Sequence, residues 1–209
     1  DNEIVAGRGF WPGLCTSVKH SCKFASYTML AKADYQYELI NPFPFALLSN
    51  DAKNDELTVM PAFSWMYNMY ALARNNWKFA HRDQRIFKVQ NIEFDTFAPD
   101  SMEESIQARK LLEVWTAKAY LRSKGEYQNE IEERELRLLG NKLLNGDQKV
   151  VDALEILGEG MEKSKRKVRI LKAYKSYHAY GDMIMHYAIK NALKWLEDNP
   201  EETFQTMAE

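Results

Sequence analysis

The sequence has little cysteine and no long hydrophobic run. Cys15 and Cys22 are its two cysteines in 209 residues, which gives neither a zinc-ligand pattern nor a disulfide framework. We expect reduced thiols, although their spacing leaves one disulfide open. The most apolar stretch, from Met60 to Ala73, contains polar residues and is shorter than the roughly 20 residues of a membrane-spanning helix. The sequence therefore predicts a protein without a membrane span.

A charge of one sign is also lacking. The formal net charge is −2, so the overall balance does not favour nucleic acid as a partner. The sequence contains no glycine-rich phosphate loop, no nucleophile elbow and no HExxH motif, and it identifies no cofactor. No charged leader precedes an apolar segment, so no signal peptide is expected. Because the chain begins with Asp1 rather than methionine, we expect a piece of a longer protein.

The first half of the chain shows β-prone runs and one aromatic helix. Phe24 to Ala31 alternates as a strand does, and Ser49 to Asp55 is typical of a polar loop. A helix is predicted from Pro61, a residue suited to the first helical position. A strand is predicted from Ile86 to Phe94. These patterns divide the first half into a β-rich part at residues 1–55 and a connecting helix and strand at residues 56–98.

Residues 99–209 are predicted to form an α-helical domain. The chain is predicted to be helical from Pro99, and this first helix has Asp100 or Ser101 as its expected N-cap and stops near Gly125. A second helix carries the apolar residues between Ile131 and Leu143. Asp147 is the expected cap of a third helix, in which Val150, Val151, Leu154 and Leu157 face inward. A long last helix is predicted from about Ser164 to Glu197.

Two histidines and an aspartate share one face of the predicted last helix. His178, Asp182 and His186 follow one another at intervals of four residues, and such a set can bind a divalent metal. The spacing is common in helices, so a packed or exposed histidine with a local carboxylate partner is the simpler interpretation. We predict no metal site and keep these three residues as weak candidates.

A basic run precedes and enters the same helix. Its cations can grip phosphate groups, but apolar residues are interleaved with them, and a run of glutamates offers a partner of opposite sign. A solvated, charge-paired helix face is the simpler interpretation. The cations are Lys163, Lys165, Arg166, Lys167, Arg169, Lys172 and Lys175, and the glutamates are Glu130, Glu132, Glu133 and Glu135.

The aromatic helix combines stacking surfaces with amides and arginine. Tyr67, Asn68 and Arg74 suit a sugar or nucleotide pocket, and a helix packed on a sheet explains the same residues. Lys32 and His20 in the β-rich part are added to this candidate site. His20, which has cations as sequence neighbours, is a weak candidate for a general base, because no carboxylate partner is identified.

A family resemblance extends over the whole chain. Residues 4–9 and 10–15 share a six-residue frame, with an apolar residue first and glycine three later. Together with the segments from Gly7 to His20, Phe24 to Lys32 and Met60 to Asn75, they resemble the C-terminal third of a large bacterial family. Those proteins carry hexapeptide repeats and are often labelled as related to UDP-N-acetylglucosamine pyrophosphorylase.

The resemblance implies an α+β, mostly α fold, in which terminal coils of a left-handed β-helix precede a C-terminal α-helical bundle. It also implies a cytoplasmic setting and a homo-oligomer. The predicted function is the C-terminal portion of a sugar-nucleotide or acyl-transferase-like protein, with a sugar phosphate or nucleotide sugar as ligand. The resemblance supplies no catalytic residues. The alternative is a non-enzymatic helical module that binds a protein or a polyanionic partner.

Overall fold

The computed structural model describes residues 3–128 and 130–200. Its first third consists of short strands, most of them two residues long, followed by a hairpin of two longer strands. The strands are β1 (Val5–Ala6), β2 (Trp11–Pro12), β3 (Ser17–Val18), β4 (Lys23–Phe24), β5 (Met29–Leu30), β6 (Asp34–Tyr35), β7 (Ile40–Asn41), β8 (Leu47–Asp51) and β9 (Glu56–Met60).

Tight turns separate the first strands at six-residue intervals. A residue with left-handed backbone occupies each of these turns, so the chain changes direction after every strand. Gly9 has φ 68°, and a Cβ atom there would lie 2.3 Å from the ring of Tyr27, so this turn requires glycine. The other left-handed residues of the series are Cys15, Ser21 and Tyr27.

The strands form three mostly parallel sheets, in the orders β1-β4-β7, β3-β6 and β10-β9-β8-β5-β2. Val5 pairs with Lys23 and Lys23 pairs with Ile40, so successive passages of the chain lie side by side. β9 runs antiparallel to β8. β10 (Lys167–Ile170) then adds to β9 in parallel, with Val168 opposite Leu57.

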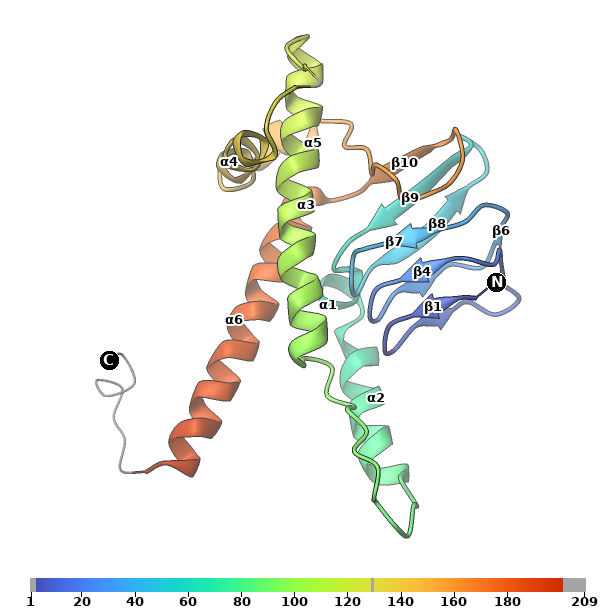
Figure 1. The fold of residues 1–209 in the computed structure, drawn as a ribbon, viewed down its shortest axis with the longest axis vertical. Helices are drawn as coiled ribbons and strands as arrows, with labels where there is room; N and C mark the ends of the chain where they lie inside the picture. Colours follow the sequence, from blue (N-terminus) through green and yellow to red (C-terminus); the bar gives the residue numbers. More distant parts are fainter. Residues whose placement is uncertain (1–2, 129, 201–209) are drawn as a thin grey trace.

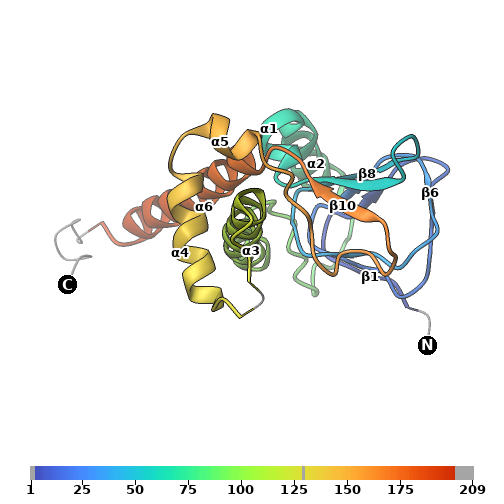
Figure 2. The same cartoon turned by 90° about the horizontal axis from the view of Figure 1, so that it is seen from above.

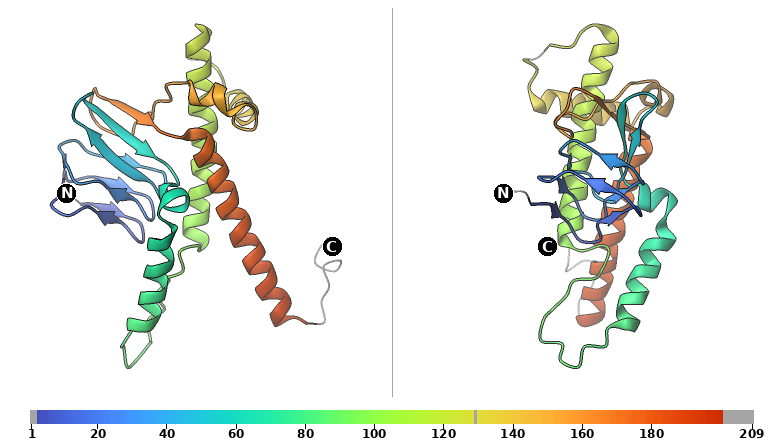
Figure 3. Two further views of the ribbon diagram at one scale, coloured as in Figure 1. Left: turned by 180° about the vertical axis from the view of Figure 1, so that it is seen from behind. Right: turned by 90° about the vertical axis from the view of Figure 1, so that its right-hand side faces the viewer.

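The helices lie on one side of the strands, as the view from above shows (Figure 2). α3 packs against α4 and α6 (Figure 1), and α2 and α6 extend beyond the strands (Figure 3). No helix within residues 3–128 and 130–200 is long and apolar enough to cross a membrane. The helices are α1 (Phe63–Tyr67), α2 (Met69–Arg82), α3 (Pro99–Lys124), α4 (Glu133–Leu144), α5 (Gln148–Asp152) and α6 (Ala173–Asp198).

One buried cluster joins the strands to the helices. The ring of Phe43, between β7 and β8, meets Trp115 of α3 edge-on at 5.5 Å. Tyr180 of α6 is fully buried, and its hydroxyl donates to the carbonyl oxygen of Pro44 and accepts from the backbone N–H of Ala62. Residues from all three predicted parts contribute to this cluster, and the boundaries at residues 55 and 98 stay a prediction.

The predicted fold class is wrong. The described residues form an α/β fold with ten short strands in three mostly parallel sheets, and they contain no left-handed β-helix followed by a separate helical bundle. β9 reverses direction beside β8, and β10 comes from the region predicted to be purely helical. A six-residue pattern indicates where the turns fall, but it does not indicate the order and direction of the strands in each sheet.

Three helix predictions are confirmed. α3 begins at Pro99, with Ala98 rather than Asp100 or Ser101 as its N-cap, and Gly125 follows it with φ 72° as the left-handed cap. α4 covers most of the segment from Ile131 to Leu143. Asp147 caps α5 as predicted, because its side chain accepts from the backbone N–H of Lys149, but α5 ends at Asp152, before the predicted inward residues Leu154 and Leu157.

Several predictions in the first half are wrong in detail. The expected strand from Phe24 to Ala31 is two strands, because Tyr27 adopts φ 56° between β4 and β5. The polar segment from Ser49 to Asp55 includes the end of β8 as well as the hairpin turn. The helix expected from Pro61 begins at Phe63 and breaks at Asn68, which has φ −141°.

Two further elements differ from the prediction. No strand forms from Ile86 to Phe94 in the described chain, where Ile86, Phe87 and Val89 are more than 80% exposed and have no strand to pair with. The segment predicted to open the last helix forms β10 instead. Residues 167–170 alternate between cations and apolar residues with period two, the pattern of a strand with one buried face.

Candidate functional site

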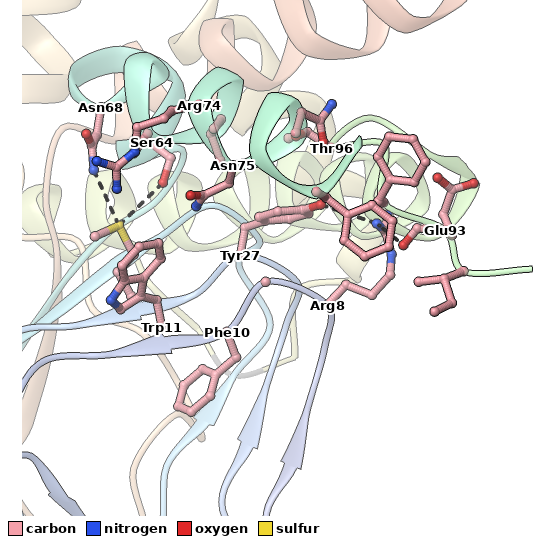
Figure 4. Close-up of a pocket in the computed structure, with 18 residues that line it drawn as sticks. Arg8, Phe10, Trp11, Tyr27, Ser64, Asn68, Arg74, Asn75, Glu93 and Thr96 are labelled. Carbon is pink, nitrogen blue, oxygen red and sulfur yellow. Dashed lines mark hydrogen bonds between the residues drawn. The ribbon is translucent and has the colours of Figure 1, made fainter. Parts of the chain in front are cut away.

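A cavity of about 610 Å³ lies between the first strands and α2. Its floor comes from the turn before β2 and from β5, its roof from α1 and α2, and its far wall from the loop before α3 (Figure 4). Apolar and aromatic side chains predominate, with a few polar groups, as in many ligand sites. The lining residues are Arg8, Gly9, Phe10, Trp11, Tyr27, Met29, Ser64, Asn68, Ala71, Leu72, Arg74, Asn75, Asn76, Phe79, Ile92, Glu93, Phe94 and Thr96.

Arg8 closes one end of the cavity. Its guanidinium donates to both carboxylate oxygens of Asp100, at 2.7 and 2.8 Å, and to the carbonyl oxygen of Asp95 at 2.9 Å. These bonds raise the pKa of Arg8 and hold the pKa of Asp100 below its usual value. Because its donors are taken up by these bonds, Arg8 fastens the loop before α3 to the first strands rather than offering a free charge.

The opposite end carries a cation with spare donors. The Nε atom of Arg74 is buried and has no hydrogen-bond partner within the part of the chain that the structure describes. Its guanidinium lies 5.9 Å from the centre of the Tyr70 ring. Asn68 and Ser64 lie beside it and contact the sulfur of Met29 at 3.9 and 3.7 Å. Figure 4 shows Arg74 and Asn68 at one end and Arg8 and Glu93 at the other.

Aromatic rings form much of the wall. Phe79 of α2 stacks on Phe94 with ring centres 4.8 Å apart, and Phe10 stacks on Phe24 at 4.6 Å. Burial is the main cause that raises the pKa of Tyr27, so its hydroxyl is protonated at neutral pH. Trp11 also lines the cavity and is about half exposed, so its indole offers a surface on which a flat ring can stack.

The structure brings together two of the predicted ligand-binding residues. Asn68 and Arg74 both line the cavity. Tyr67 ends α1 and lines a different hollow of about 510 Å³ beside α6. Lys32 and His20 are exposed and line neither hollow, and His20 contacts the hydroxyl of Ser21 at 3.3 Å.

The sequence pattern missed the half of the cavity that the strands supply. Trp11 reaches it because β2 and β5 are neighbours in one sheet, and the turns that hold Arg8 and Tyr27 are joined by a hydrogen bond from the backbone N–H of Tyr27 to the carbonyl oxygen of Arg8. The six-residue rhythm of the turns is the signal that places Trp11 opposite Met29. That rhythm alone does not reveal which face of the strands α2 covers.

The three metal candidates are separated by other contacts. His178 contacts the carbonyl oxygen of Leu144 through Nε2 at 2.9 Å, and the ring of His186 packs against Trp65 and Phe97. No group of three or more His, Cys, Asp or Glu side chains suited to a metal ion occurs in residues 3–128 and 130–200.

The basic run is largely paired within the protein. Lys163 contacts Glu38, Arg166 contacts the buried Glu162, and Lys167 contacts Glu155. Arg169 lies 3.6 Å from Glu56. These partners are not the glutamates at residues 130–135 that the sequence offered. Both cysteines are free, Cys15 exposed and Cys22 buried.

Comparison with known proteins gives one informative match. The chain is 36% identical over 203 residues to an uncharacterized protein of Treponema pallidum (strain Nichols), in a match covering 94% of this chain and 26% of that protein. The chain thus spans about a quarter of the length of this relative. No family model and no solved structure matches the chain. The resemblance to hexapeptide-repeat proteins stays a prediction.

Proposed function

We propose that the cavity under α2 binds a small organic ligand that carries a ring and an anionic group. The observation that carries this proposal is the unbonded, buried Nε of Arg74 at one end of an aromatic-lined cavity. An unsatisfied buried donor costs free energy unless a ligand or water completes it. Sugar phosphates and nucleotide sugars combine the required parts.

The ligand site would serve a longer protein. The cavity supplies stacking surfaces and an arginine, and its lining contains no histidine or cysteine. We therefore propose that this chain holds the ligand and that residues elsewhere in the longer protein carry out a transferase-like reaction. A cytoplasmic setting is part of this proposal, and the two free thiols are compatible with it.

A cavity-filling variant tests the site. Ala71 lines the cavity, whereas Ala80 lies on α2 outside the lining and is exposed. Thermal unfolding of the chain would be followed with UDP-N-acetylglucosamine, glucose 1-phosphate and coenzyme A. A bound ligand raises the melting temperature by mass action, equivalent to about 2.7 kcal/mol at 100 times Kd.

We expect at least one probe to raise the melting temperature of the wild-type chain and of Ala80→Trp. Ala71→Trp should lose that shift because the indole fills the space of the ligand. An unchanged shift in Ala71→Trp would reject the cavity as the binding site. Absence of any shift in the wild type would reject these ligand classes.

A second candidate function is self-association through α6, and an exposed apolar stripe favours it. Met185, Ile189 and Leu193 are 52–60% exposed and follow one another at intervals of four residues. The stripe is symmetric about Ile189. A second, antiparallel copy centred at Ile189 would place Met185 of each helix beside Leu193 of the other, so we propose that the partner is another copy of this chain.

A further inference from the structure

Three cations form a row along α2 where that helix passes over the cavity. Arg74, Lys78 and Arg82 are spaced four residues apart, so successive Cα atoms rise by about 6 Å along one side of the helix. Arg74 lines the cavity, and Lys78 and Arg82 continue the row by one and two turns toward the end of α2.

No carboxylate of the described residues forms an ion pair with this row. The nearby acids have other partners. Asp83 is held by Arg85 at 2.8 Å and lies 3.5 Å from Lys88. Asp95 accepts from Lys190. The side chain of Glu93, at the Arg8 end of the cavity, accepts from the backbone N–H of Asp95.

The row is electrostatically unfavourable in the free protein. Like charges four residues apart destabilise a helix. The field of Arg74 is the first cause that lowers the pKa of Lys78, with burial and Arg82 adding to it. A polyanion lying along the row would relieve this repulsion.

We propose that the ligand of the cavity is a nucleoside diphosphate or a compound built on one, with its ring in the cavity and its two linked phosphates along Arg74, Lys78 and Arg82. This inference rests on the proposed function. Two linked phosphates carry more charge and more acceptor oxygens than one, so they can bond to more of these three cations. Arginine and lysine are the side chains that proteins use to hold such groups.

The test compares uridine, UMP and UDP, and the matching adenosine series, by isothermal titration calorimetry at two salt concentrations. With the wild-type chain, affinity in at least one series should rise about tenfold or more from nucleoside to diphosphate, and this gain should shrink in high salt. Lys78→Gln and Arg82→Gln should each reduce the diphosphate gain several-fold and leave nucleoside binding unchanged. Lys194→Gln removes an exposed cation from α6 and serves as the control.

The outcomes separate the two proposals. If Ala71→Trp abolishes nucleoside binding while the row variants keep the full diphosphate gain, the cavity stands and the phosphate assignment is overturned. If the wild type binds nucleoside and diphosphate equally, the assignment is likewise overturned. If neither series binds at all, both the phosphate assignment and a nucleotide ligand for the cavity are rejected. Equal melting temperatures of the variants would show that they are folded.

Discussion

At the scale of the residue, Tyr180 is the clearest link between the two halves of the chain. Its hydroxyl lies in the fully buried core, 2.7 Å from the carbonyl oxygen of Pro44 and 3.1 Å from the backbone nitrogen of Ala62. Ala62 has φ 53° and begins the turn into α1. One hydroxyl therefore satisfies two backbone groups that position the roof of the cavity.

Tyr180→Phe should lower the free energy of unfolding by about 1–3 kcal/mol. The phenyl ring fills the same space but leaves a buried N–H and a buried C=O without a partner. Urea denaturation of both proteins would measure the difference. Tyr187→Phe, on the same helix, is the control, because no hydrogen bond of its hydroxyl occurs among the described residues. Equal losses in the two variants would contradict this role of Tyr180.

At the scale of the element, α4 approaches α3 at a glycine. A Cβ atom added to Gly140 would lie 1.8 Å from the carbonyl oxygen of Glu113. The side chain of Glu113 is nearly buried and accepts from Arg137, Asn141 and the hydroxyl of Tyr177. The close approach at Gly140 therefore brings α3, α4 and α6 into one hydrogen-bonded group.

Gly140→Ala should destabilise the protein by about 3 kcal/mol. In an isolated helix the same change is stabilising by about 1 kcal/mol, so the sign of the effect reports the contact with α3. Gly181→Ala, inside helix α6, is the matched control, because the added Cβ atom would lie 3.5 Å from the side chain of Arg109, an ordinary van der Waals contact. Thermal unfolding of both variants gives the answer, and a stabilised Gly140→Ala would contradict the packing.

The elements that could be predicted from sequence are those with local signals. α3 follows from Pro99 and Gly125, and α5 follows from Asp147, because capping is decided within a few residues. β10 could not be predicted in this way, since its strand state depends on β9, more than 100 residues earlier.

The same distinction holds for the candidate site. Asn68 and Arg74 were predicted because they belong to one segment rich in aromatic and polar residues. Tyr67 belongs to the same segment, but α1 ends there and its side chain lines the hollow beside α6 instead. Trp11 and Tyr27 were missed as site residues because their positions under α2 depend on how the short strands pair, as β2 does with β5.

At the scale of the whole molecule, the proposed self-association rests on the exposed apolar stripe of α6. Met185, Ile189 and Leu193 belong to the second half of α6, and the end of this helix extends beyond the strands (Figure 3). An apolar stripe on one helix cannot form a hydrophobic core by itself, but it can pack against the same stripe of a second helix.

Ile189→Glu should convert a dimer of this chain to a monomer, because it places a charge in the apolar interface between the two copies of α6. Light scattering coupled to gel filtration would measure the mass of each protein at the same concentration. Asn191→Glu, an exposed change on another face of α6, should leave the mass unchanged. A monomeric wild-type chain, or a dimeric Ile189→Glu variant, would reject self-association through α6.

The position of β10 has a consequence for how the protein is made. β9 is complete once residue 60 has left the ribosome, but the strand that pairs with its outer edge is synthesised more than 100 residues later. Until then, the edge of β9 keeps unpaired backbone groups next to Leu57 and Val59, which are fully buried in the finished fold. A nascent or truncated chain that stops before Lys167 therefore presents an unpaired strand edge, which favours aggregation with other chains.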